Sequence, residues 1–103
     1  MQFSLFIEAI NLEETKKFLE DFYKFAVKYG VSYSVTNIEK YWKIDEMYTI
    51  SLEVDKSTRK NVKTMLSNIA SKWEEYPDDL LASKTMEDCE IYIPNLYMIV
   101  VYI

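Results

Sequence analysis

The sequence predicts an α+β fold in which two helices cover one face of an antiparallel β-sheet. Three observations support this prediction. Apolar residues alternate along several short segments, they recur at spacings of three and four along two longer ones, and the chain has only one glycine and two prolines. The predicted elements follow the order β-α-β-β-α-β, with one extra strand before the last. Because that order is typical of a split β-α-β sandwich, we expect residues 1–103 to form a single two-layer α+β domain.

The first third of the chain contains the clearest signals for a strand followed by a helix. Residues 2–10 alternate and have one entirely apolar side, which predicts a strand. Asn11 and Glu14 have the spacing of a capping box directly before a helical pattern of apolar residues, which predicts a helix over 12–29. Gly30, the only glycine, lies where a helix end favours a positive φ.

The middle of the chain predicts two strands and a second helix. Residues 31–42 are rich in β-branched and aromatic types, and residues 47–54 show the cleanest alternation in the chain. Asp55 begins a group of candidate N-caps. A narrow apolar stripe at helical spacing then predicts a helix that Pro77 ends by residue 76 at the latest; the stripe consists of Val62, Met65, Leu66, Ile69 and Trp73.

The last part of the chain is less regular. Residues 80–83 form either a short strand or an extended loop, and residues 86–89 predict a turn. Residues 90–93 and 96–103, separated by Pro-Asn, predict two strands joined by a turn. The final segment is nearly all apolar, as expected for a central strand.

Negative charge is concentrated late in the sequence. The chain carries a net charge of -5, and residues 74–90 contain one base, Lys84, against seven acids: Glu74, Glu75, Asp78, Asp79, Glu87, Asp88 and Glu90. The rest of the chain is therefore about neutral. A concentrated acidic surface attracts cationic partners and accelerates their association by long-range steering. A charge run of this kind is either a solvated loop or a docking surface for a basic protein, and we interpret these seven acids as candidate partner-binding residues.

The residue types present disfavour catalysis, metal binding and cofactor binding. The chain has no histidine, which is the commonest general base and metal ligand. Cys89 lies between two acids, whereas reactive cysteines lie in electropositive surroundings. The carboxylates at 78–79 and 87–90 could bind a hard cation, but they lack the spacing and the glycine of a calcium loop. We therefore predict no enzyme activity, no metal and no cofactor.

Nucleic acid and membranes are disfavoured as partners. Four basic residues at the start of the second predicted helix are too few for a nucleic-acid footprint on an acidic chain, so they are expected to face solvent. No segment reaches the roughly 20 apolar residues that a membrane-spanning helix needs. The sequence shows no secretory signal and has a single cysteine, which together predict a cytoplasmic protein.

Four aromatic residues are candidate contacts outside the core. Tyr41 and Trp42 follow the second predicted strand, where they either anchor an interface or fold over the open end of the sheet. Tyr76 and Tyr92 flank the acidic segment. Tyrosine beside carboxylate suits a partner rich in lysine and arginine, through hydrogen bonds and cation–π contacts.

The predicted architecture resembles a ferredoxin-like sandwich, and the chain resembles the small acidic immunity proteins of contact-dependent and polymorphic bacterial toxin systems. The shared features are the length, the acidic balance, the many tyrosines and the acidic stretch from Tyr76-Pro-Asp-Asp to Glu90-Ile-Tyr-Ile-Pro. The resemblance implies a non-enzymatic inhibitor that binds a basic toxin domain, often a nuclease.

Two other classes remain open at the level of sequence. One is a ferredoxin-like regulatory domain that senses a small molecule, and the other is a dimeric α+β barrel enzyme. Both predict a stable homodimer. The single glycine and the polar residues on one sheet face, among them Ser4, Glu8, Ser51 and Glu53, favour the protein-binding class over both.

Overall fold

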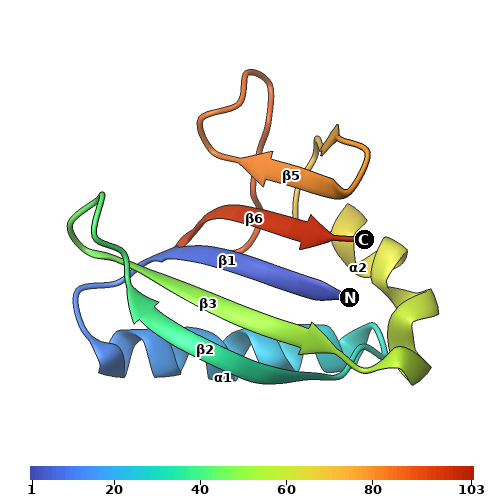
Figure 1. Ribbon diagram of the computed structural model, residues 1–103, viewed down its shortest axis with the longest axis horizontal. Helices are drawn as coiled ribbons and strands as arrows, with labels where there is room; N and C mark the ends of the chain where they lie inside the picture. Colours follow the sequence, from blue (N-terminus) through green and yellow to red (C-terminus); the bar gives the residue numbers. More distant parts are fainter.

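A six-stranded antiparallel sheet forms the centre of the computed structural model, which describes all residues 1–103 (Figure 1). The strands lie in the order β2-β3-β1-β6-β5-β4. Their bounds are β1 (Gln2–Glu8), β2 (Tyr33–Lys40), β3 (Met47–Val54), β4 (Glu74–Glu75), β5 (Asp79–Ser83) and β6 (Leu96–Tyr102). The helices are α1 (Leu12–Lys28) and α2 (Val62–Ser67), and a 3₁₀ helix, η1 (Lys56–Asn61), leads into α2. The predicted α+β class is confirmed.

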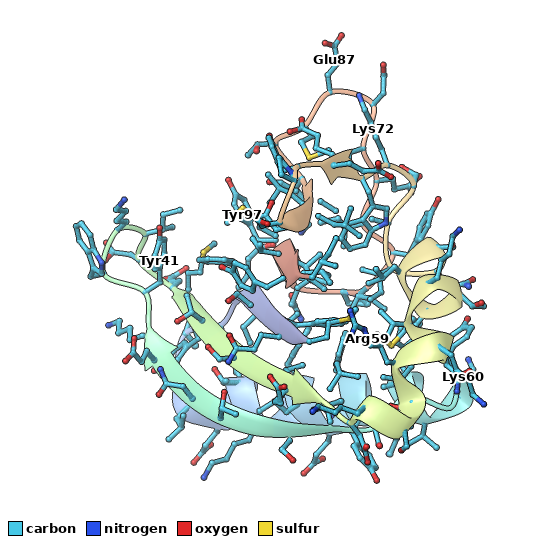
Figure 2. The ribbon with its side chains drawn as sticks, turned by 45° about the vertical axis from the view of Figure 1, so that its right-hand side comes forward. Tyr41, Arg59, Lys60, Lys72, Glu87 and Tyr97 are labelled. Carbon is cyan, nitrogen blue, oxygen red and sulfur yellow. The ribbon has the colours of Figure 1, made fainter.

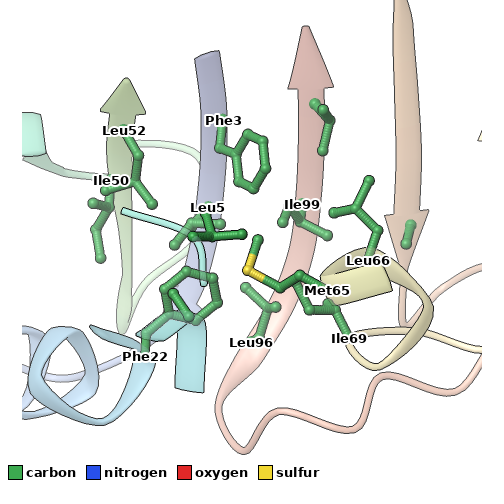
Figure 3. Close-up of a cluster of buried hydrophobic side chains, with 14 of the residues drawn as sticks. Phe3, Leu5, Phe22, Ile50, Leu52, Met65, Leu66, Ile69, Leu96 and Ile99 are labelled. Carbon is green, nitrogen blue, oxygen red and sulfur yellow. The ribbon is translucent and has the colours of Figure 1, made fainter. Parts of the chain in front are cut away.

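One face of the sheet and both helices share a single core. Leu5 of β1 is paired with Ile50 of β3 on one side and with Ile99 of β6 on the other, and all three side chains are fully buried. Phe22 of α1 and Met65 of α2 pack into the same cluster (Figure 3). The two helices therefore cover the same face, as the alternation in the strands and the helical stripes predict.

Helix α1 has the ends that the sequence predicts. The Glu14 amide donates to Asn11 Oδ1 over 2.9 Å, and Glu14 Oε1 accepts from the amide of Ile10 over 3.0 Å. At the other end Gly30 has a φ of 71°, and its amide donates to the carbonyl of Val27. These bonds satisfy backbone groups that have no partner inside the helix.

The second helix is much shorter than predicted. It ends at Ser67, so the expectation of a helix reaching residue 76 is wrong. The Ser67 hydroxyl donates to the carbonyl of Lys63, and the Asn68 amide group donates to that of Thr64. The Trp73 indole donates to the carbonyl of Leu66 over 3.1 Å. The Asn68 side chain replaces the backbone donor that a longer helix would supply to Thr64, and the amides of Ile69 and Ala70 donate to the Leu66 carbonyl beside the indole. The last carbonyls are therefore satisfied, and the helix can end here.

The C-terminal half contains one strand that sequence reasoning missed and lacks one that it predicted. β4 pairs with β5, which settles residues 79–83 as a strand rather than a loop. The predicted strand over 90–93 is wrong, because only Ile91 forms a bridge, to Ala70. The predicted strand over 96–103 is confirmed as β6, and residues 84–88 form turns.

Candidate protein-binding surface

Residues 74–79 form a short acidic hairpin, which we call the acidic hairpin. Glu74 and Glu75 constitute β4, and the amide of Tyr76 donates to the carbonyl of Asp79 over 2.9 Å to close the turn. Glu75 and Asp78 are exposed, whereas Glu74 and Asp79 are half-buried. The turn is also fixed from β6, because the amide of Ile103 donates to the carbonyl of Asp78. Four carboxylates are thus held on one edge of the sheet.

Residues 84–90, which we call the acidic loop, follow β5 and carry the other three acids. The loop is tied to the segment after α2. The Ser71 hydroxyl accepts from the amide of Glu90 over 2.8 Å, and Lys72 Nζ donates to the carbonyl of Glu87 over 3.1 Å. Asp88 takes a φ of 59°, which places it at a tight turn beside Cys89. The loop projects from the sheet with Glu87 at its tip (Figure 2).

The seven acids lie along the β5 side of the sheet. The turn of the hairpin and the acidic loop are at opposite ends of β5 (Figure 1), which is a five-residue strand and therefore about 17 Å long. Between them, Glu74 and Glu75 pair with Leu81 and Leu80. The structure therefore brings the predicted acids to one edge of the molecule.

The only base of the acidic segment points away from it. Lys84 Nζ lies 2.6 Å from Glu8 Oε1 on β1. The other ion pair joins the Met1 amino group to Glu53 over 3.4 Å, so none of the seven acids takes part in an ion pair. Lys72 Nζ contacts the acidic loop at the Glu87 carbonyl, whereas no lysine or arginine forms a hydrogen bond or ion pair with the acidic hairpin. The acidic hairpin therefore has the least compensated charge.

Tyr76 is the aromatic residue of the acidic hairpin, and it is half exposed. Its hydroxyl donates to Glu74 Oε2 over 2.6 Å. This hydrogen bond, with the negative charge of Glu74, raises the pKa of the Tyr76 hydroxyl, and Asp79 adds a smaller effect. The ring thus remains a neutral, amphipathic surface next to free carboxylates at neutral pH.

Tyr41 and Trp42 take different roles in the turn between β2 and β3. The Tyr41 ring packs edge-on against Phe6 on the helix-free face of the sheet, with ring centroids 5.3 Å apart. Trp42 is 82% exposed, and Lys43 Nζ lies 5.1 Å from its ring centroid. Tyr41 therefore folds over the open face, whereas Trp42 is presented to solvent. The turn lies at the same end of the strands as the acidic loop.

Tyr92 lies beside the segment that follows α2. It is half exposed, but its amide donates to the carbonyl of Ile69 just beyond α2. Lys72, in contrast, contacts the acidic loop. The sequence did not indicate this contact, because it depends on α2 ending at Ser67.

Two shallow grooves flank α1. One, of about 490 Å³, lies between α1 and residues 93–95 and has Glu8, Lys17 and Asp21 on its rim. The other, of about 570 Å³, lies between α1 and β2 and is lined by Leu19, Glu20, Tyr23, Lys24, Lys16, Tyr33 and Val35. Tyr23 falls on the apolar helical pattern of the sequence, yet its side chain is 52% exposed at this second groove.

Three further findings bear on the class of site. No group of three or more cysteine or acidic side chains is arranged to hold a metal ion. Neither helix combines the length and apolarity needed to cross a membrane. Comparison of the chain with family models, curated proteins and solved structures found no match.

Proposed function

We propose that this protein is a non-enzymatic binding module that captures and neutralises a basic protein, and that this partner is a toxin domain. The observation that carries the proposal is the acidic edge. Seven carboxylates lie along the β5 side of the sheet, none of them is in an ion pair, and the one base among them is directed to Glu8. Because no cation neutralises these carboxylates, their full negative charge contributes to the electrostatic field that attracts a cationic partner.

The acidic hairpin is the centre of the proposed contact. Its backbone is held by hydrogen bonds, so little backbone freedom is lost when a partner binds. Tyr76 supplies a ring beside Glu74, which suits an arginine or lysine side chain. The acidic loop extends the contact past the end of β5, and Trp42 is an exposed anchor at the same end of the sheet.

We also propose that the domain is a two-layer ferredoxin-like sandwich with an added hairpin. β6, β1, β3 and β2 are neighbours in that order, with α1 between β1 and β2 along the chain and α2 after β3. β4 and β5 then extend this four-stranded unit at one edge. In this view the added hairpin carries the binding surface, and the four-stranded unit supports it.

The proposal is tested by affinity capture with three immobilised forms of the protein. The first is the unchanged chain, and the second carries Glu75→Lys and Asp78→Lys in the acidic hairpin. The third, a matched control, carries Asp21→Lys and Glu39→Lys, which reverse two exposed acids elsewhere and change the net charge equally. The probes are the source cytoplasm and the product of the adjacent open reading frame.

The expected result is a basic protein that binds the unchanged chain and the control but not the hairpin variant. Its affinity should fall as salt is raised, and co-expression with this chain should suppress its activity. Capture of the same protein by all three forms, or binding that is insensitive to salt, would contradict the proposal.

A further inference from the structure

We propose that the edge strand β2 pairs with β2 of a second copy, so that the protein forms a symmetric dimer through a continuous sheet. This inference is independent of the proposed function, because it concerns the edge of the sheet opposite the acidic hairpin. β2 is eight residues long and pairs only with β3, so its outer backbone groups have no strand beside them. Such an edge is a template for another strand.

The backbone pattern shows which residues face outward. The Ser32 carbonyl accepts from the amide of Asp55, and the Tyr41 amide donates to the carbonyl of Met47. The backbone groups of Ser32 and Tyr41 therefore point toward β3. Backbone groups alternate along a strand, and the register shift between Val35 and Asn37 offsets the alternation once. The outward residues are therefore Tyr33, Val35, Ile38 and Lys40.

This outward set is self-complementary. A two-fold axis between Thr36 and Asn37 places Val35 opposite Ile38 of the second copy and Tyr33 opposite Lys40. Every outward residue then faces another outward residue, although the register shift leaves two residues, instead of one, between Val35 and Ile38. An antiparallel pair of this kind exchanges two backbone hydrogen bonds at each such position. A regular strand would lose register with β2 at this shift. The second copy has the same shift at the same place, so the two β2 strands stay in register with each other.

The side chains that this register places opposite one another along the two β2 strands are compatible. Glu39 faces Ser34 of the second copy, so no like charges meet along the strands. The groove between α1 and β2 lies directly beside Val35, and Tyr23 and Val35 are 52% and 43% exposed. The second copy's Ile38 would cover part of this apolar surface. Burial, with a smaller effect of nearby Tyr23, already raises the pKa of the Tyr33 hydroxyl in the groove to about 12.

Charge favours a second copy at this edge over pairing at the other. In a dimer through β2 the two acidic hairpins stand at the far ends of a twelve-stranded sheet, about 50 Å apart at a strand spacing of about 4.8 Å. That separation is several times the Debye length of about 8 Å, so the repulsion is screened. Pairing through β4 would instead bring Glu74 and Glu75 against their own copies.

The test compares the oligomeric state of the unchanged protein with two matched variants, using light scattering after gel filtration and sedimentation velocity over a wide concentration range. Val35→Lys places a charge on the β2 edge. Ile10→Lys makes the same change at an exposed apolar residue outside the groove. We expect the unchanged protein and Ile10→Lys to dimerise and Val35→Lys to remain monomeric.

Amide hydrogen exchange provides a second readout that does not depend on a variant folding. The amides of Tyr33, Val35, Ile38 and Lys40 should become more protected as protein concentration rises. A chain that stays monomeric throughout, or a dimer that survives Val35→Lys with these amides unprotected, would overturn the proposal. Protection that arises only when an extended segment of another protein is added would also overturn it.

Discussion

The two edge strands of the sheet, β4 and β2, differ in how readily they can pair with a strand of another chain. Each exposes backbone groups that could pair with a foreign strand. At one edge β4 is only two residues long and consists of Glu74 and Glu75, with Asp78 and Asp79 beside it. At the other edge β2 has eight residues, of which one is acidic and one basic. The first edge repels strands and attracts cations, whereas the second remains available to a strand.

The two proposals assign different kinds of recognition to the two edges. At the β4 edge, attraction acts over a distance and is weakened by salt. At the β2 edge, recognition requires contact, a matching register and burial of apolar surface, so it depends little on ionic strength. The predictions below change one edge at a time.

The largest effect is expected from charge reversal at the β4 edge. With a basic partner in hand, Glu75→Lys and Asp78→Lys should slow association about 10-fold to 100-fold at low salt, by loss of steering. Glu87→Lys and Glu90→Lys in the acidic loop should have a smaller effect, because Lys72 Nζ already lies at the Glu87 carbonyl. Stopped-flow kinetics measures both. Equal effects of the two pairs would show that the acidic hairpin has no special role.

Gly30→Ala should destabilise the fold beside the β2 edge. Gly30 has a φ of 71°, and an added Cβ would lie 2.8 Å from Nδ2 of Asn61, which donates to the Gly30 carbonyl. We expect a loss of about 1–2 kcal/mol in the free energy of unfolding, measured by urea denaturation. Adding Asn61→Ala relieves the steric part but removes a hydrogen bond. If Gly30→Ala alone were as stable as the unchanged protein, the positive φ at residue 30 would be contradicted.

Trp73→Phe should lower the stability of the segment that connects α2 to β4. The indole donates to the Leu66 carbonyl at the end of α2, and Trp73 immediately precedes β4. Loss of this bond should cost about 1 kcal/mol. Hydrogen exchange should accelerate in β4 and β5 and stay unchanged in β2. Faster exchange in β2 instead would mean that the two edges are coupled.

A pH titration tests whether the Tyr33 side chain lies in the groove beside β2. The pKa of Tyr33 is raised from 10.0 to about 12, so the folded chain holds this proton more tightly than the unfolded chain. The contribution of Tyr33 to stability is therefore lost as pH rises from 10.0 to about 12. The unchanged protein should lose stability relative to Tyr33→Phe over that window. A difference that is independent of pH would place Tyr33 in water rather than in the groove.

Local signals in the sequence predict the first half of the fold well and the second half poorly. α1 follows from its cap at Asn11, its apolar spacing and Gly30, all of which act within a few residues. The early end of α2 could not be predicted, because Trp73 continues the helical spacing while its indole in fact closes the helix from a distance. β4 was missed because two consecutive glutamates have no β-propensity and pair only through the hairpin.

The candidate site was predicted in composition but not in geometry. The acids of residues 74–90 are visible as a charge run, and the exposure of Trp42 is one of two alternatives that the sequence left open. The pairing of Lys84 with Glu8, 76 positions apart, requires the strand order. The groove beside β2 likewise depends on which strand forms the edge, and no local pattern determines that.

The most direct test of the account is to map the contacts of the basic partner by amide chemical shifts of the isotope-labelled protein. The account predicts shifts in the acidic hairpin, in the acidic loop and at the Trp42 indole, with β2 unchanged and the shifts weakening as salt is added. Shifts concentrated in β2 and the adjacent face of α1, with residues 74–79 unaffected, would contradict it.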